Sequence, residues 1–62
     1  MRKFTIYGLD EGQRLLATEE IRAADVASAR LMAAERLKDF PRIELWEGSV
    51  CISRKSRPKD RD

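Results

Sequence analysis

The sequence predicts an α+β domain in the order strand, strand, helix, strand, strand. Apolar and polar residues alternate from Lys3 to Tyr7, and Ile43 to Ile52 has the pattern of two short strands joined by a turn. Glu11-Gly12 and Glu47-Gly48 mark turns, and strong helix formers dominate residues 26–39. A right-handed crossover through the helix places the third strand beside the first. We therefore expect a four-stranded, mainly antiparallel sheet in the order 2-1-3-4 with one helix on one face; a domain-swapped or intermolecular sheet is the alternative.

In the first hairpin, the length of the loop decides which residues of the second strand face the core. One alternating set on that strand is apolar: Leu15, Ala17 and Ile21. An even loop directs this set toward Phe4 and Ile6, whereas a three-residue loop at 10–12 directs Leu16 inward. We expect the even loop, because Ile21 then faces the core without a bulge. Glu19 would face the same way, so the strand should overhang the helix or bulge there.

The helix is expected to span about Asp25 to Asp39. The carboxylate of Asp25 can accept hydrogen bonds from the first helical turn, and Pro41 disfavours helical geometry at the residue before it. Ala27, Leu31 and Ala34 form a second apolar arc, so Leu31 should be exposed, either as an ordinary surface leucine or as a contact residue. The arc expected to face the sheet contains Val26, Ala29, Ala33, Leu37 and Phe40.

The second hairpin is expected to turn at Glu47-Gly48. Leu45 then pairs with Val50 and Ile43 with Ile52, which places these four aliphatic residues on the core face. The other face carries Trp46 and Cys51, and Trp46 needs either its own hairpin or a partner to cover it. The complete predicted core contains Phe4, Ile6, Leu15, Ile21, Val26, Ala29, Ala33, Leu37, Phe40, Ile43, Leu45, Val50 and Ile52.

The segment Ile43-Glu44-Leu45-Trp46-Glu47-Gly48, which follows a helix that begins after Ala24-Asp25, resembles a group of short uncharacterised bacterial proteins. Those proteins have a similar Glu-apolar-Trp-x-Gly hairpin and the same order of strands and helix. The resemblance covers most of residues 3 to 54. It implies the same fold and a bacterial source, and it brings no activity, substrate or catalytic residue.

Positive charge is concentrated at the C-terminal end of the chain. The net charge is +2, but residues 1–53 contain eight Lys or Arg and nine Asp or Glu, a balance of −1. After Ile52 there is no apolar residue to offset the entropy of ordering the chain. We therefore expect a single domain over residues 1–54 and a disordered basic tail over residues 55–62.

The sequence also bears on location. No apolar run approaches the roughly 20 residues of a membrane-spanning helix. The N-terminus lacks the apolar stretch of a signal peptide, and a small secreted domain would more often be rich in cysteine. We expect a cytoplasmic protein that does not contact membranes.

Few residues could support catalysis. The chain has no histidine, so Ser-His-Asp and Cys-His arrangements cannot form within it. Glu19 and Glu20 are neighbours on a strand and point to opposite faces. Cys51 is the single cysteine and is expected on a strand, where a small apolar role is more common than a reactive thiol. We expect no enzymatic activity, no cofactor and no bound metal.

The sequence favours a binding or assembly module that acts through protein contacts, as a homodimer or with another protein. A 62-residue chain with an alanine-rich core has little buried surface, and self-association is one of the usual ways to stabilise such a chain. One sheet face is expected to lack a covering layer. The candidate interface residues on that face and on the outer helix are Tyr7, Leu16, Leu31, Trp46 and Cys51.

Nucleic-acid association is the alternative function. A basic tail can neutralise phosphates, and aromatic residues on an open sheet face can stack on bases. The body of the domain is nearly neutral, however, and such tails often serve only solubility. The candidate contact residues are Arg14, Arg22, Arg54, Lys55, Arg57 and Lys59, with Tyr7 and Trp46 as stacking residues.

Overall fold

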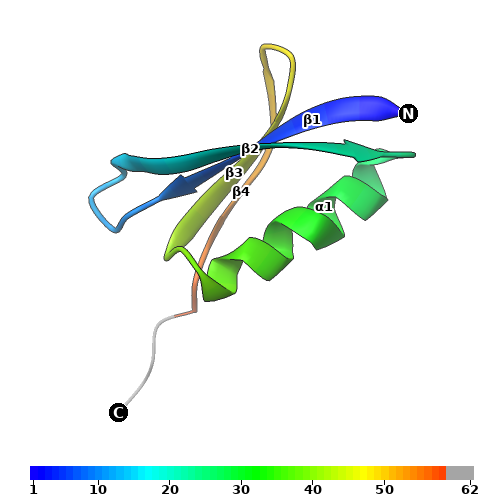
Figure 1. Cartoon of the computed structure of the whole chain (residues 1–62). Helices are drawn as coiled ribbons and strands as arrows, with labels where there is room; N and C mark the ends of the chain where they lie inside the picture. The colour runs from blue at the N-terminus through cyan, green and yellow to red at the C-terminus, as the bar shows by residue number, and fades with distance from the viewer. Residues whose placement is uncertain (59–62) are drawn as a thin grey trace.

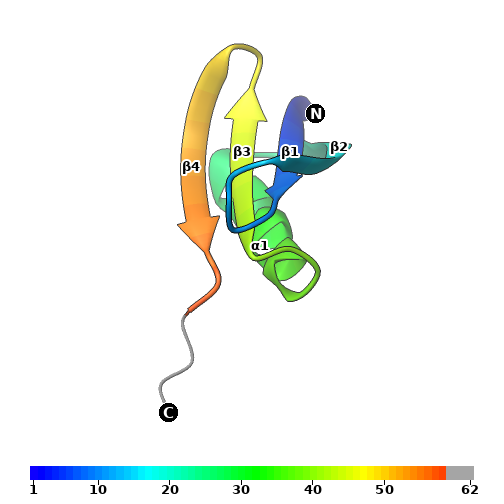
Figure 2. The ribbon, with the colours of Figure 1, turned by 90° about the vertical axis from the view of Figure 1, so that its left-hand side faces the viewer.

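The computed structural model describes residues 1–58 and contains one antiparallel sheet with one helix across it (Figure 1). The strand order is β2-β1-β3-β4, and every neighbouring pair is antiparallel, which confirms the predicted fold class and topology. Figure 2 views the strands with the helix behind them. The elements are β1 (Arg2–Leu9), β2 (Leu15–Ala23), α1 (Val26–Glu35), the 3₁₀ turn η1 (Arg36–Lys38), β3 (Arg42–Glu47) and β4 (Val50–Ser56).

The loop between β1 and β2 has an odd length, so the predicted even loop is wrong. Leu9 pairs with Leu15, and a one-residue bulge at Leu16 then restores the parity, so that Phe4 lies opposite Ile21. Ile21 is buried as predicted, but Leu15 is 58% exposed and is not a core residue. The odd loop turns Leu15 away from the helix, and the bulge returns the rest of β2 to the predicted face.

Glu19 faces the helix side of the sheet, as its position two residues before Ile21 requires. Arg36 of η1 reaches it with two hydrogen bonds, from Nε to Oε1 at 2.7 Å and from Nη2 to Oε2 at 2.8 Å. This bidentate pair connects β2 to the end of the helical segment. It is also the reason that an acidic residue is tolerated in a strand position directed toward the helix side.

The helix begins where the sequence indicates. Asp25 is the N-cap, and its Oδ1 accepts a hydrogen bond from the backbone N–H of Ser28 at 2.8 Å. The α-helix ends at Glu35 and continues as a 3₁₀ turn to Lys38, so the predicted span to Asp39 is correct in extent but not in helix type.

The aromatic ring of Phe40 sits directly over the backbone of Gly8 on the covered face of the sheet. A Cβ at Gly8 would lie 2.6 Å from Cδ2 of Phe40, which is far inside contact distance. Gly8 therefore provides the space that lets the end of the helical segment pack on β1.

The β3–β4 hairpin turns one residue later than predicted. Glu47 pairs with Val50, and the turn residues are Gly48 and Ser49. Gly48 has a positive φ of 61°, and glycine is favoured at the first position of a tight hairpin turn of this kind. Trp46 lies opposite Cys51, and a bulge at Ile52 then pairs Leu45 with Ser53.

Because the turn is shifted by one residue, the prediction that Val50 belongs to the core is wrong. Val50 is 59% exposed, because it lies beside the turn and not beside Leu45. Ile52, the bulged residue, still packs against the core. Ala23 is buried and Met32 is packed against the core, although neither was in the predicted set. The buried apolar residues are Phe4, Ile6, Ile21, Ala23, Ala29, Ala33, Ile43 and Leu45.

The C-terminal boundary lies later than predicted. Lys55 and Ser56 belong to β4, and the backbone N–H of Arg57 donates to the carbonyl of Pro41 at 2.7 Å. The Arg57 Nε also donates to the carbonyl of Leu37 at 2.8 Å. The predicted tail therefore starts too early, and its residues 59–62 lie outside the described part of the chain. Within residues 1–58, no helix has the length and apolar character needed to cross a membrane.

Candidate interaction surface

The side of the sheet away from α1, here called the open face, is formed by alternate residues of all four strands (Figure 2). Directly paired residues point to the same side of a sheet. Trp46 lies between Thr5 of β1 and Cys51 of β4, and Glu44 lies between Tyr7 and Arg54. The register therefore gathers these side chains into one surface that spans β1, β3 and β4.

Tyr7 and Trp46 form the centre of the open face. Their ring centroids are 6.2 Å apart at an interplanar angle of 83°, an edge-to-face arrangement. The indole Nε1 of Trp46 donates to Oε1 of Glu44 at 2.9 Å. Both aromatic residues are half-buried. The indole N–H of Trp46 is thus satisfied within the chain, and the two rings remain partly exposed on the open face.

The Arg54 guanidinium beside the aromatic pair is loosely held. Glu44 Oε2 lies 3.5 Å from Nε of Arg54, whose side chain is 70% exposed. An exposed ion pair of this length contributes little to stability, so the Arg54 side chain is free to turn toward another acceptor. Cys51 is a free, half-buried thiol with Sγ 3.9 Å from the carbonyl oxygen of Ser53.

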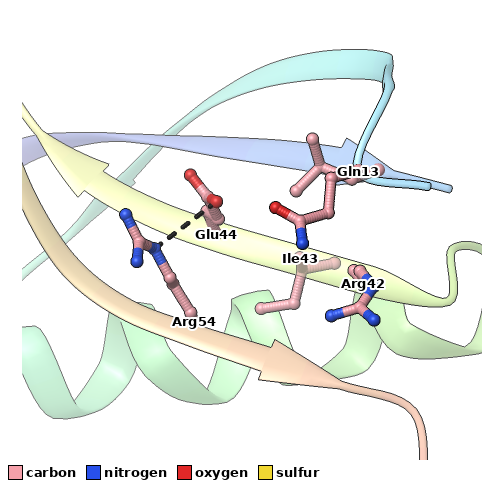
Figure 3. Close-up of a pocket in the computed structure, with 6 residues that line it drawn as sticks. Gln13, Arg42, Ile43, Glu44 and Arg54 are labelled. Carbon is pink, nitrogen blue, oxygen red and sulfur yellow. Dashed lines mark ion pairs between the residues drawn. The ribbon is translucent and has the colours of Figure 1, made fainter. Parts of the chain in front are cut away.

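One end of the open face contains a hollow, which Figure 3 shows. Arg42 enters it from the start of β3, and its Nη1 donates to Oγ of Ser56 at 3.2 Å. The Nε of Arg42 is buried and has no hydrogen-bond partner among the described residues. The hollow is lined by Leu9, Gln13, Arg42, Ile43, Glu44 and Arg54.

The structure brings together only some of the predicted interface residues. Tyr7, Trp46 and Cys51 share the open face, as predicted. Leu16 is exposed at the bulge of the edge strand β2. Leu31 is 71% exposed, as predicted, but it lies on the outer side of α1. Leu31 borders a separate shallow groove, which is lined by Ala27, Arg30, Leu31, Ala34, Ser53 and Lys55.

The predicted nucleic-acid contact residues do not form one patch in residues 1–58. Arg22 is exposed on β2, and Arg54 pairs with Glu44 across the open face. Lys55 lines the groove beside the helix, and the guanidinium of Arg57 is hydrogen-bonded to Leu37. Of the two remaining candidates, Arg14 lies in the loop between β1 and β2, and Lys59 lies outside the described residues.

Outside the open face, three carboxylates are held by specific donors. Arg2 binds Glu47 through Nε at 2.9 Å and Nη2 at 2.7 Å, and this hydrogen bonding lowers the pKa of Glu47. The hydrogen bond from the backbone of Ser28 lowers the pKa of Asp25. The hydrogen bonds from Arg36 lower the pKa of Glu19 in the same way. These pairs hold the edges of the covered side together.

Arg42 and Gln13, which line the hollow, were not among the residues predicted from the sequence to form a site. Arg42 and Gln13 are 29 positions apart in the sequence, and no local pattern joins them. Residues 1–58 contain no group of three or more acidic or cysteine side chains placed to hold a metal ion. The chain matches no protein-family model, no curated protein and no solved structure.

Proposed function

We propose that this chain is a non-enzymatic protein-binding module that forms a homodimer through the open face of its sheet. The observation that carries the proposal is that α1 covers one face only, while Tyr7 and Trp46 are half-buried on the other. A second copy placed face to face would add a second layer over these rings. Such a contact uses the same surface in both copies and closes with two-fold symmetry.

Two features of the open face support self-association. Leu15, turned away from the core by the odd first loop, adds apolar surface opposite Leu9 on the neighbouring strand. The face also carries both signs of charge, including the pairs Lys3–Glu20 and Arg54–Glu44. In a two-fold arrangement, an acidic group of one copy can approach a basic group of the other.

Analytical ultracentrifugation with two matched leucine variants tests the proposal. Leu15 and Leu31 are both exposed, so Leu15→Lys and Leu31→Lys should both fold. We expect the wild type to be dimeric at micromolar concentration, Leu15→Lys to be monomeric and Leu31→Lys to remain dimeric. Trp46→Ala should weaken the dimer as well. A monomeric wild type would refute self-association, and dissociation by Leu31→Lys alone would move the interface to the helix.

The nucleic-acid alternative is tested by a different pair of changes. Because Lys55 and Ser56 are part of β4, deletion of residues 55–62 would also damage the sheet. The double variant Arg54→Gln, Lys55→Gln removes the charge and keeps the strand. Salt-sensitive binding of single-stranded oligonucleotides by the wild type, weakened in this variant, would support the alternative. Absence of binding at low salt would remove it.

A further inference from the structure

Two arginines of this chain hold a carboxylate through the same edge of the guanidinium group. Arg2 uses Nε and Nη2 to bind both oxygens of Glu47, at 2.9 and 2.7 Å. Arg36 uses Nε and Nη2 to bind both oxygens of Glu19, at 2.7 and 2.8 Å. The planar guanidinium fork matches the spacing of the two carboxylate oxygens, which makes this pairing strong and selective.

The Nε edge of the Arg42 guanidinium, in contrast, binds no carboxylate within residues 1–58. Its Nη1 is used by Ser56, and its Nε is buried with no acceptor. None of the ion pairs in residues 1–58 includes Arg42. A buried N–H group without a partner is unfavourable, and such groups in folded proteins call for an explanation. Glu44 is close by, but its oxygens already hold Trp46 and Arg54.

We propose that the hollow at Arg42 binds the carboxylate group of a ligand. The Arg42 side chain would turn to uncover its buried Nε edge, and this edge would then hold the two oxygens. Arg54 would add positive charge by turning away from its long contact with Glu44. With two arginines and one glutamate, the hollow carries excess positive charge. Its volume of about 240 Å³ is below the roughly 300–1,000 Å³ of pockets that hold drug-sized molecules, so a small group fits best.

Gln13 supplies the third polar contact in this site. Figure 3 shows its carboxamide extended over β3, between Glu44 and Arg42. Its backbone has a positive φ of 68°, a conformation that favours glycine and is strained for other residues. Strained residues often occur at binding sites, where the side chain has a role that offsets the strain. The amide N–H₂ of Gln13 can donate to a carboxylate once the side chain moves aside from Arg42.

The carboxylate has two possible sources, a small molecule in solution or an acidic side chain of a second copy. Both present the same group to Arg42. The site does not depend on the proposed homodimer, because it is formed by residues of one chain. The two sources are separated by adding a free carboxylate and, independently, by diluting the protein.

Nuclear magnetic resonance tests the site directly, because each arginine Nε–H group gives its own signal. Sodium acetate is titrated at about pH 6, where carboxylates are ionised, with sodium chloride at equal ionic strength as the reference. We expect the Arg42 Nε–H signal to shift and to saturate on the order of 1 mM acetate, an affinity suited to one small group. The signals of Arg2 and Arg36 should not move, because their edges are filled.

Three variants measure how much each side chain contributes to acetate binding. Binding is also followed through the indole N–H signal of Trp46, which donates to Glu44 in the lining of the hollow. Arg42→Lys should require about tenfold more acetate, because lysine lacks the fork. Gln13→Gly should also weaken binding; tighter binding would show that Gln13 covers the site and does not donate. Arg30→Lys, on the helix, is the control and should bind as the wild type does.

Dilution without acetate identifies the source. An Arg42 signal that moves on dilution, and that is fixed in monomeric Leu15→Lys, would assign the carboxylate to a second copy. A signal that responds only to acetate would assign it to a small molecule. Equal small shifts of all arginine signals, or an equal response to chloride, would overturn the site whatever the oligomeric state.

Discussion

The two faces of the sheet satisfy their side chains in different ways. On the covered face, Phe4 and Leu45 are fully buried beneath α1, and Glu47 and Glu19 at its rim are paired with arginines. On the open face, Trp46 is half-buried and is held by one ring contact and one hydrogen bond. The covered face therefore determines whether the chain folds, and the open face leaves ring surface and charged groups exposed.

The largest expected effect comes from two neighbouring residues that point to opposite faces. Leu45→Ala leaves a cavity in the covered core and should cost about 2–5 kcal/mol, which approaches the total stability of a domain this small. Trp46→Ala should cost less stability, because its ring keeps solvent contact, yet it should weaken the proposed dimer more. Urea unfolding and ultracentrifugation of both variants check this. If both variants lose the same stability and weaken dimerisation equally, the two faces do not differ in role.

The next prediction concerns the close contact between Gly8 and Phe40. A methyl group at Gly8 meets the ring of Phe40 and forces it outward, so Gly8→Ala should destabilise the fold by about 1–3 kcal/mol. Gly12→Ala is the matched control, because its nearest atom is Asp10 Oδ1 at 3.4 Å. Urea unfolding should show a loss for Gly8→Ala only. Similar stability of both variants would mean that the end of the helical segment is not packed as described.

Acid should loosen the covered side through three carboxylates. The pKa values of Asp25, Glu19 and Glu47 are lowered in the folded protein by hydrogen bonds. Between the unfolded and folded pKa values, the unfolded chain binds more protons, so stability rises with pH. Their contribution should be complete above about pH 5 and should decline as the pH falls below about 4.

Unfolding in urea at several pH values measures this acid effect. Glu47→Gln removes one of the three carboxylates and should flatten the pH dependence below about pH 4. Glu11→Gln, in the exposed first loop, is the matched control for the loss of one carboxylate. A wild-type stability that does not decline in acid would contradict the role of these paired groups.

The order of elements could be predicted because strong signals agree with one another. Asp25 and Pro41 define the helical segment, and alternation within β1 and β3 places Phe4 and Leu45 in the core. The hairpin registers could not be predicted, since each depends on one bulge. The bulge at Leu16 follows an odd loop, and the resulting change of face is visible only at Leu15.

The candidate surfaces, like the fold, could be predicted only in part from the sequence. Tyr7 and Trp46 could be assigned to the uncovered side from alternation alone, and the exposure of Leu31 followed from the helical period. The hollow at Arg42 could not be found in this way, because Gln13 reaches it through a left-handed backbone conformation that no residue pattern announces. Arg54 joins it only because the bulge at Ile52 sets the register of β4.

The smallest expected effect separates folding from binding on the open face. Gly at position 13 adopts a positive φ without strain but loses more entropy on folding, so Gln13→Gly should stabilise the domain by about 0.5–1 kcal/mol. That corresponds to a rise of a few degrees in the thermal midpoint for a domain of this size. Calorimetry compares Gln13→Gly with Gln13→Ala, which keeps the backbone strain and also lacks the carboxamide. The difference between the two variants measures the effect of the backbone strain on stability. A gain in stability together with weaker acetate binding would show that the strain at Gln13 is retained for the ligand and not for the fold. A loss of stability in Gln13→Gly would instead show that the Gln13 side chain supports the loop itself.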